Sequence, residues 1–135
     1  MTTTLNAVTS TGLVQTSDGS GVIKVQSNGV TTNALAWVNF NGVTTTTIRS
    51  SYNVSSITRN STGDYTVNFA SALSNANYVA VTAYNFAEAN TGANNSSLQT
   101  VLSTKTSSSI EIRAWYGSGG GSLDVSDANL AIFGN

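Results

Sequence analysis

The chain contains no histidine and no cysteine, so few of its side chains could do chemistry. This absence removes the usual general base, the thiol nucleophile, the serine–histidine–aspartate triad and nearly all zinc sites. What remains is the chemistry of paired carboxylates, which glycosidases hold about 5–9.5 Å apart on either side of a sugar bond. The chain has six acidic residues, Asp18, Asp64, Glu88, Glu111, Asp124 and Asp127.

Asp124 and Asp127 are the carboxylates whose spacing comes closest to that requirement, in the segment DVSDAN. Aspartate is also an ordinary turn residue, and we favour that interpretation: the two residues are predicted to make a turn. The same segment could offer oxygen atoms to a calcium ion, but it lacks the ligand number and spacing of a calcium-binding loop. The sequence therefore predicts no catalytic residues, no metal and no cofactor.

A group of aromatic and polar side chains in the second half of the chain has the composition of a carbohydrate-binding surface. Sugar rings stack on aromatic side chains, while amides and carboxylates bind sugar hydroxyl groups. The candidate ligand-binding residues are Tyr84, Phe86, Glu88, Asn90, Asn94, Asn95, Glu111, Arg113 and Trp115. The plainer alternative, which we favour, makes Trp37, Trp115 and Tyr116 core or subunit-contact residues.

The composition indicates an all-β protein that forms one domain over residues 1–135. Charged residues make up only 8% of the chain, against a usual value of about 25%. Threonine and valine suit strands, whereas the helix-forming residues are scattered without a 3.6-residue period. Proline is absent, so the twelve glycines and the many asparagines must make the turns.

Strand-like runs recur every 8–12 residues or so with turn signals between them, which is typical of an antiparallel β-sandwich or jelly roll of about eight to ten strands. The clearest unit is a hairpin whose loop is Asn60 to Gly63. A short N-terminal arm, residues 1–11, precedes the first run, and residues 88–96 form an exposed loop. The predicted runs are a hairpin over 13–26, then 34–40, 44–49, 52–59, 64–69, 77–86, 98–104, 109–116 and 128–134.

Alternation within these runs predicts which side chains form the core. Two runs, 34–40 and 77–86, are apolar on both faces, which favours a central strand of the sandwich or, for 34–40, an edge packed against another subunit. We expect 77–86 to be central. The predicted core residues from the other runs are Tyr65, Val67, Phe69, Ile110, Ile112, Ala114, Leu130, Ile132 and Phe133.

Charge and hydropathy narrow the range of partners. The isoelectric point is about 4.9 and the five basic residues are scattered, so we expect no nucleic-acid binding. The first ten residues lack the basic and apolar regions of a signal peptide, and no window reaches the roughly 20 apolar residues of a membrane helix. We therefore expect a soluble chain made in the cytosol, without membrane insertion.

One segment resembles a known group of proteins. Residues 36–81 contain WVNFNG, then IRSSYNVSSIT, a GDYTVNF strand and an NY strand. This order is similar to that of a segment in tail-fibre-like and other small structural proteins of tailed bacteriophages. The resemblance covers about a third of the chain and supplies no catalytic residues to transfer. It implies a non-enzymatic virion component, made in the host cytoplasm, with a homotrimer as the family-level expectation.

The leading hypothesis is therefore a short tail fibre or receptor-binding tip that contacts host-surface glycan. The alternative is a capsid decoration protein that cements neighbouring capsomers by burying surface at their junctions. A more remote alternative is a glycan depolymerase. In the first two cases the partners are further copies of the chain and other virion proteins, and no enzymatic activity is expected.

Overall fold

The computed structural model of the protein describes residues 26–27, 30–86, 97–101, 104–115 and 121–134. These residues are almost entirely β-structure. None of them forms a helix of the length and apolarity needed to cross a membrane. The strands are β1 Gln26–Ser27, β2 Val30–Thr31, β3 Ala36–Asn41, β4 Thr47–Tyr52, β5 Val54–Ser61, β6 Asp64–Phe69, β7 Tyr78–Phe86, β8 Ser97–Val101, β9 Ser109–Trp115 and β10 Val125–Gly134.

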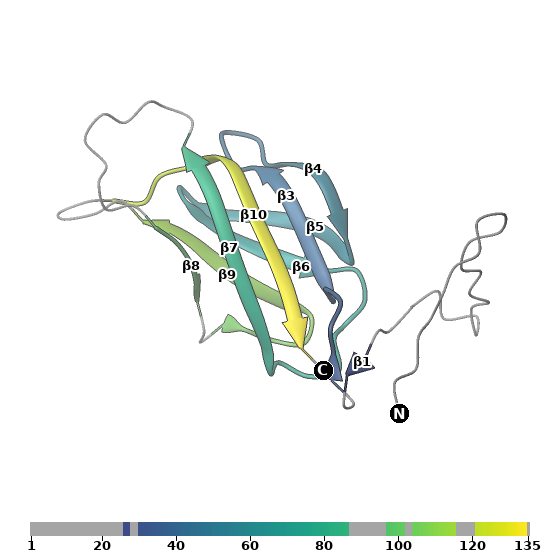
Figure 1. Cartoon of the computed structure of the whole chain (residues 1–135). Helices are drawn as coiled ribbons and strands as arrows, with labels where there is room; N and C mark the ends of the chain where they lie inside the picture. Colours follow the sequence, from purple (N-terminus) through teal and green to yellow (C-terminus); the bar gives the residue numbers. More distant parts are fainter. Residues whose placement is uncertain (1–25, 28–29, 87–96, 102–103, 116–120, 135) are drawn as a thin grey trace, which may run out of the picture.

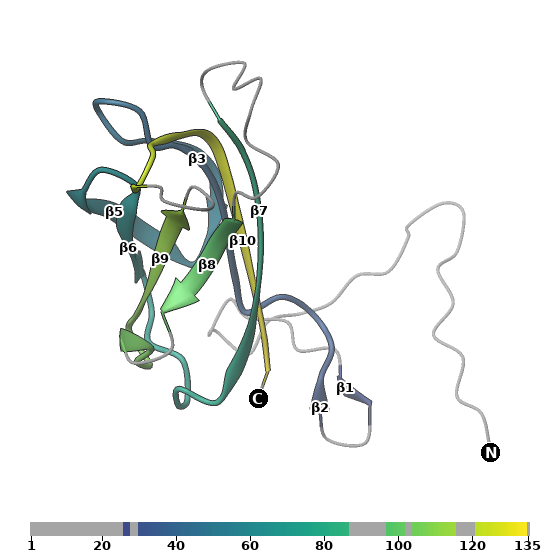
Figure 2. The ribbon, with the colours of Figure 1, turned by 90° about the vertical axis from the view of Figure 1, so that its left-hand side faces the viewer.

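Two four-stranded sheets form a sandwich, which confirms the predicted all-β fold. Sheet I has the order β4-β3-β10-β7 and sheet II has the order β5-β6-β9-β8, and all pairings within them are antiparallel. Figure 2 shows the two sheets as separate layers facing each other, with the small β1-β2 hairpin to one side. Each sheet therefore has an inner face toward the core and an outer face.

The core lies between the sheets and is made by alternate residues of both. Its largest members meet edge to face, with ring centroids 5.3 Å apart for Phe40 and Tyr65 and 5.9 Å apart for Phe69 and Tyr78. The prediction was wrong for Phe133, because alternation turns its side chain away from the face shared by Leu130 and Ile132. The other predicted core residues are confirmed as buried: Tyr65, Val67, Phe69, Ile110, Ile112, Ala114, Leu130 and Ile132.

The predicted hairpin around 60–63 is present as β5-β6, and the runs predicted at 98–104 and 109–116 pair with each other as β8-β9. The first is tighter than predicted, because only Thr62 and Gly63 separate the strands. Gly63 has a φ of 68°, a left-handed conformation that glycine adopts without steric cost. Asn53, also left-handed with a φ of 53°, separates β4 from β5 and marks the point where the chain passes from sheet I to sheet II.

The turn predicted for Asp124 to Asp127 is wrong. Strand β10 begins at Val125, and the irregularity lies within the strand, as a register shift between Val125 and Asp127. A bulge of this kind absorbs one residue without ending the strand. The two aspartates pair with arginines on other strands, Asp124 with Arg59 on β5 and Asp127 with Arg49 on β4, so their carboxylates are satisfied without a turn.

The central position predicted for residues 77–86 is also wrong. Among the described strands β7 pairs with β10 alone and so forms one edge of sheet I. Its inner residues, such as Tyr78, do face the core, but Val79 and Val81 face outward and are 63% and 55% exposed. The second apolar face therefore reflects an outer surface of sheet I that no other described strand covers, and not a strand buried on both sides.

Some predictions fall on residues that the structure does not describe. They are the N-terminal arm 1–11, the hairpin 13–26 apart from its last residue, the loop 88–96, and Tyr116.

The strands predicted at 44–49 and 52–59 are present as β4 and β5, but β4 begins three residues later than predicted and β5 two residues later.

Candidate binding surface

The structure divides the predicted glycan-binding residues between the two sheets. Glu111, Arg113 and Trp115 share the outer face of sheet II on β9, as the alternation predicts. Tyr84 lies on β7 in sheet I, where it is half-buried against the core. Tyr84 is therefore not brought onto one surface with the β9 residues.

The remaining predicted residues are less fully described. Phe86 ends β7, and nothing is described of its side chain. The other four, Glu88, Asn90, Asn94 and Asn95, lie outside the described residues.

The outer face of sheet II is polar, and its side chains bond to one another. The Asn60 amide donates to Asp64 at 2.9 Å and to Thr66 at 3.0 Å. Arg113 lies between two acids, with Nε 3.0 Å from Asp64 and Nη2 2.5 Å from Glu111. The charge of Asp64, followed by that of Glu111, raises the pKa of Arg113. We call this surface the polar face; its residues include Ser56, Thr58, Asn60, Asp64, Thr66, Asn68, Glu111 and Arg113.

The outer face of sheet I has the opposite character. Strand register sets Trp37 between Tyr52 on β4 and Ala131 on β10, and Ala131 is followed by Val81 on β7. Five of the six large hydrophobic side chains found exposed among the described residues belong to this sheet, and the sixth is Trp115. We call the surface the apolar face; its large members, with their exposed fractions, are Trp37 38%, Tyr52 42%, Val79 63%, Val81 55% and Phe133 37%.

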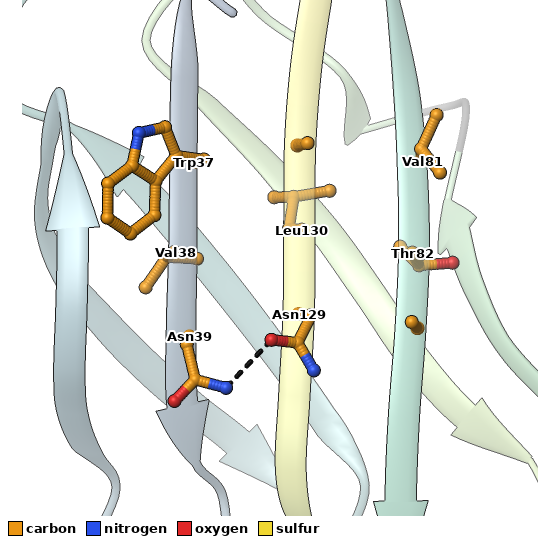
Figure 3. Close-up of a pocket in the computed structure, with 9 residues that line it drawn as sticks. Trp37, Val38, Asn39, Val81, Thr82, Asn129 and Leu130 are labelled. Carbon is orange, nitrogen blue, oxygen red and sulfur yellow. Dashed lines mark hydrogen bonds between the residues drawn. The ribbon is translucent and has the colours of Figure 1, made fainter.

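A hollow of about 390 Å³ crosses the apolar face between Trp37 and Val81 (Figure 3). Small side chains make this hollow, because Ala131 and Ala83 rise less from the sheet than the tryptophan and valine beside them. Its polar end is formed by Asn39, whose amide donates to Asn129 Oδ1 at 2.7 Å. The lining is thus mainly apolar, with amides at one end.

A group of bonded polar side chains closes that end of the apolar face. Arg49 lies 3.1 Å from Asp127 and also donates to the backbone oxygen of Ser126 at 2.5 Å. Asn39 donates to the same Asp127 carboxylate. The carboxylate of Asp127 is therefore shared between a cation and an amide.

Asp124 has different partners, at the end of the sandwich where the β5-β6 hairpin meets the start of β10. Its carboxylate accepts hydrogen bonds from Arg59 Nε at 3.1 Å, Arg59 Nη2 at 2.7 Å, the Gly63 N–H at 2.9 Å and the Tyr65 hydroxyl at 2.8 Å. Burial by itself raises the pKa of Asp124, but the hydrogen bonds from Arg59, Gly63 and Tyr65 outweigh it and lower that pKa. Burial, followed by the bond to Asp124, raises the pKa of Tyr65.

The surroundings of Asp124 and Asp127 differ from those that a glycosidase carboxylate pair requires. A glycosidase acid must hold its proton near neutral pH, which requires a raised pKa. Asp124 is instead kept ionised by Arg59, while Asp127 bonds to Arg49 on the outer face of sheet I. Within the described residues, no three acidic side chains gather where they could hold a metal ion.

Comparison with protein-family models, with curated proteins and with solved structures finds no match to this chain. The resemblance of residues 36–81 to phage structural proteins therefore stays a prediction. From the sequence, a subunit contact was one alternative for residues 34–40 and for Trp37, but the continuation of this face onto β7 was missed. The signal was present, because residues 34–40 and 77–86, which contain β3 and β7, are apolar at both parities.

Proposed function

We propose that this chain is a non-enzymatic structural component of a tailed-bacteriophage virion, and more specifically a short tail fibre or receptor-binding tip that contacts host-surface glycan. The observation that carries the structural role is the apolar outer face of sheet I. Soluble monomeric proteins rarely expose contiguous apolar patches this rich in large side chains, and such patches are typical of interaction sites. The resemblance of residues 36–81 supplies the virion context.

The environment of the acidic residues supports a role without catalysis. Asp64, Glu111, Asp124 and Asp127 are each paired with an arginine. The hydrogen bonds from Arg59 help to lower the pKa of Asp124, and Asp64 joins β6 to the neighbouring β9 through Arg113.

The glycan contact is proposed for the β9 part of the predicted platform. Trp115 is 50% exposed on the outer face of sheet II and offers an aromatic surface for a sugar ring. Arg113 and Glu111 lie on the same outer face of β9 and supply polar groups.

Capsid decoration is the second candidate, and the apolar face favours it as well. A decoration protein needs a surface that becomes buried against neighbouring subunits and needs no ligand. The two candidates therefore differ in where the protein lies on the virion and in whether it binds glycan.

Labelling of virions separates these candidates directly. Antibody raised against the purified chain is applied to particles of the encoding phage and viewed by negative-stain electron microscopy. Label at the distal end of the tail supports the fibre tip, and label spread over the capsid supports decoration. Absence of label from intact and from disrupted particles would contradict a virion role.

Binding to host cells or to isolated lipopolysaccharide tests the glycan contact. We expect the Trp115→Ala variant to bind at least about tenfold more weakly, because an exposed aromatic ring supplies much of the contact with a sugar. The Thr58→Ala variant changes a hydroxyl on the same face, away from β9, and serves as the control. Equal binding by both variants would exclude the β9 platform.

A further inference from the structure

We infer that the apolar face is the surface through which copies of this chain pack against one another. The inference rests on the assembly role proposed above and names the residues that perform it. It concerns Trp37, Tyr52, Val79, Val81 and Phe133, whereas the proposed glycan contact lies on the opposite sheet.

The contrast between the two outer faces shows that the apolar face is a specific feature of sheet I. Both sheets have four strands and bury their inner faces in the same core. On sheet II the outward positions are mostly hydroxyl, amide and charged groups that bond to each other. On sheet I the outward positions across the middle of the sheet are tryptophan, alanine and valine. A sheet with one face in water has polar outward residues, so sheet I has the pattern of a sheet covered on both sides.

The charge of the face favours a second copy of the same chain as the occupant. Arg49 and Asp127 are its charged groups among the described residues, and they pair with each other at one end. The face therefore carries no net charge, and the whole chain carries a net charge of only −1. Identical neutral faces can meet without like-charge repulsion, whereas the face offers nothing that would select a strongly charged partner.

The hydrogen bonding of the hollow argues against a sugar as its occupant. A sugar site needs polar groups that converge on the ligand hydroxyls. The Asn39 amide instead donates to Asn129 and Asp127, and the rest of the lining is mainly apolar. An apolar side chain of a second copy matches this hollow better.

The dimensions of sheet I are sufficient for such a contact. Strands lie about 4.8 Å apart and rise about 3.3 Å per residue, so four strands of this length present on the order of 500 Å². Two such faces bury on the order of 1,000 Å² together, which is close to the lower limit for a specific interface. We therefore expect association that is measurable at micromolar concentration.

The test is the mass of the purified chain by sedimentation equilibrium between about 1 and about 100 µM, a range that brackets the expected association. The wild-type chain should form a species at a multiple of 13.9 kDa. Two copies would pair face to face, and three would turn their apolar faces toward a common axis. Val81→Asp should raise the dissociation constant at least about 30-fold, because it places a charge in the middle of a contact that excludes water.

Thr58→Asp is the matched control, since Thr58 is exposed on a strand of sheet II while Val81 is 55% exposed on a strand of sheet I. It should leave the dissociation constant within about threefold of wild type. If Val81→Asp fails to fold, as judged by circular dichroism, Val81→Thr replaces it. Threonine keeps the branched shape and should weaken association about fivefold.

Three results would overturn the inference. They are a wild-type chain that stays monomeric across the concentration range, equal effects of the Val81→Asp and Thr58→Asp variants, and a monomer that binds another protein or a glycan through the apolar face. A monomeric chain that still labels the virion would overturn this contact alone. An oligomer that fails to label any particle would overturn the proposed function alone.

Discussion

Asp124 joins elements that are far apart in the sequence. Arg59 and Tyr65 come from strands of sheet II, and Asp124 directly precedes β10 of sheet I. Four hydrogen bonds from three residues, Arg59, Gly63 and Tyr65, converge on this carboxylate, whose side chain is 19% exposed. Hydrogen bonds to an ionised acceptor are stronger than those between neutral groups.

We predict that Asp124→Asn lowers the free energy of unfolding at pH 7 by about 2 kcal/mol, because an amide offers one weaker acceptor to these donors. The folded pKa of Asp124 is lowered, so its stabilisation is complete above the unfolded value of about 3.9 and is lost as pH falls through the folded value. The difference between wild type and variant should therefore shrink below about pH 4, as measured by urea unfolding at several pH values.

Asp127→Asn is the control for this prediction. Asp127 and Arg49 are both 46% exposed, and an exposed ion pair contributes only about 0–1 kcal/mol. The role assigned to the Asp124 carboxylate would be contradicted if Asp127→Asn lowered the free energy of unfolding as much as Asp124→Asn does. It would also be contradicted if the effect of Asp124→Asn did not depend on pH.

The β5-β6 hairpin depends on Gly63, whose backbone is left-handed and closely surrounded. A Cβ atom at this position would lie 2.6 Å from the Leu123 oxygen and 2.9 Å from the Ala114 oxygen. Both neighbours are backbone atoms. The Gly63 carbonyl also accepts a hydrogen bond from the Ala114 N–H, and the Gly63 N–H donates to the Asp124 carboxylate. We predict that Gly63→Ala lowers the free energy of unfolding by roughly 2–4 kcal/mol, from the combined cost of the left-handed conformation and the crowding.

Gly121→Ala provides the comparison, because a Cβ atom there would meet nothing within 4 Å. Its effect should stay within about 0.5 kcal/mol, as for other open surface positions. Thermal unfolding of both variants at one protein concentration measures the difference. Equal stability of the two variants would mean that the hairpin does not need a left-handed residue at position 63.

Alternation identified most of the strands and their inner faces, because burial of one face is a local, period-two property of the sequence. It gave β6 at its observed bounds and placed Ile110, Ile112 and Ala114 together in the core. It could not place β7 at an edge, since an outer face covered by another molecule has the same pattern as a face covered within the chain.

The candidate site was harder to predict than the strands, because it depends on which sheet each strand joins. Tyr84 and Trp115 both lie on apolar-rich strands, and only the order of the strands shows that these strands belong to different sheets. The ion pairs of Asp124 and Asp127 likewise join residues 65 and 78 positions apart. No local pattern reports such contacts.

The described residues form a sandwich with one polar and one apolar outer face, and charged residues make up only 8% of the chain. If copies meet through the apolar face, their association is driven by removal of apolar surface from water and not by ion pairing. We predict that raising NaCl from about 50 to about 500 mM changes the dissociation constant less than about threefold, because screening acts on exposed charges. Sodium sulfate should tighten association, because excluded salts favour burial of apolar surface.

Sedimentation equilibrium in each salt measures this, and Arg49→Gln is the control that removes the cation at the edge of the face. This variant should associate within about threefold of wild type, because an exposed ion pair is weak and its loss leaves Trp37 and Val81 in place. If NaCl weakens association steeply and Arg49→Gln raises the dissociation constant strongly, the contact is made by the Arg49–Asp127 end of the sheet and not by the apolar side chains. A dissociation constant that is insensitive to NaCl but is raised by Val81→Asp is expected only if the apolar side chains make the contact.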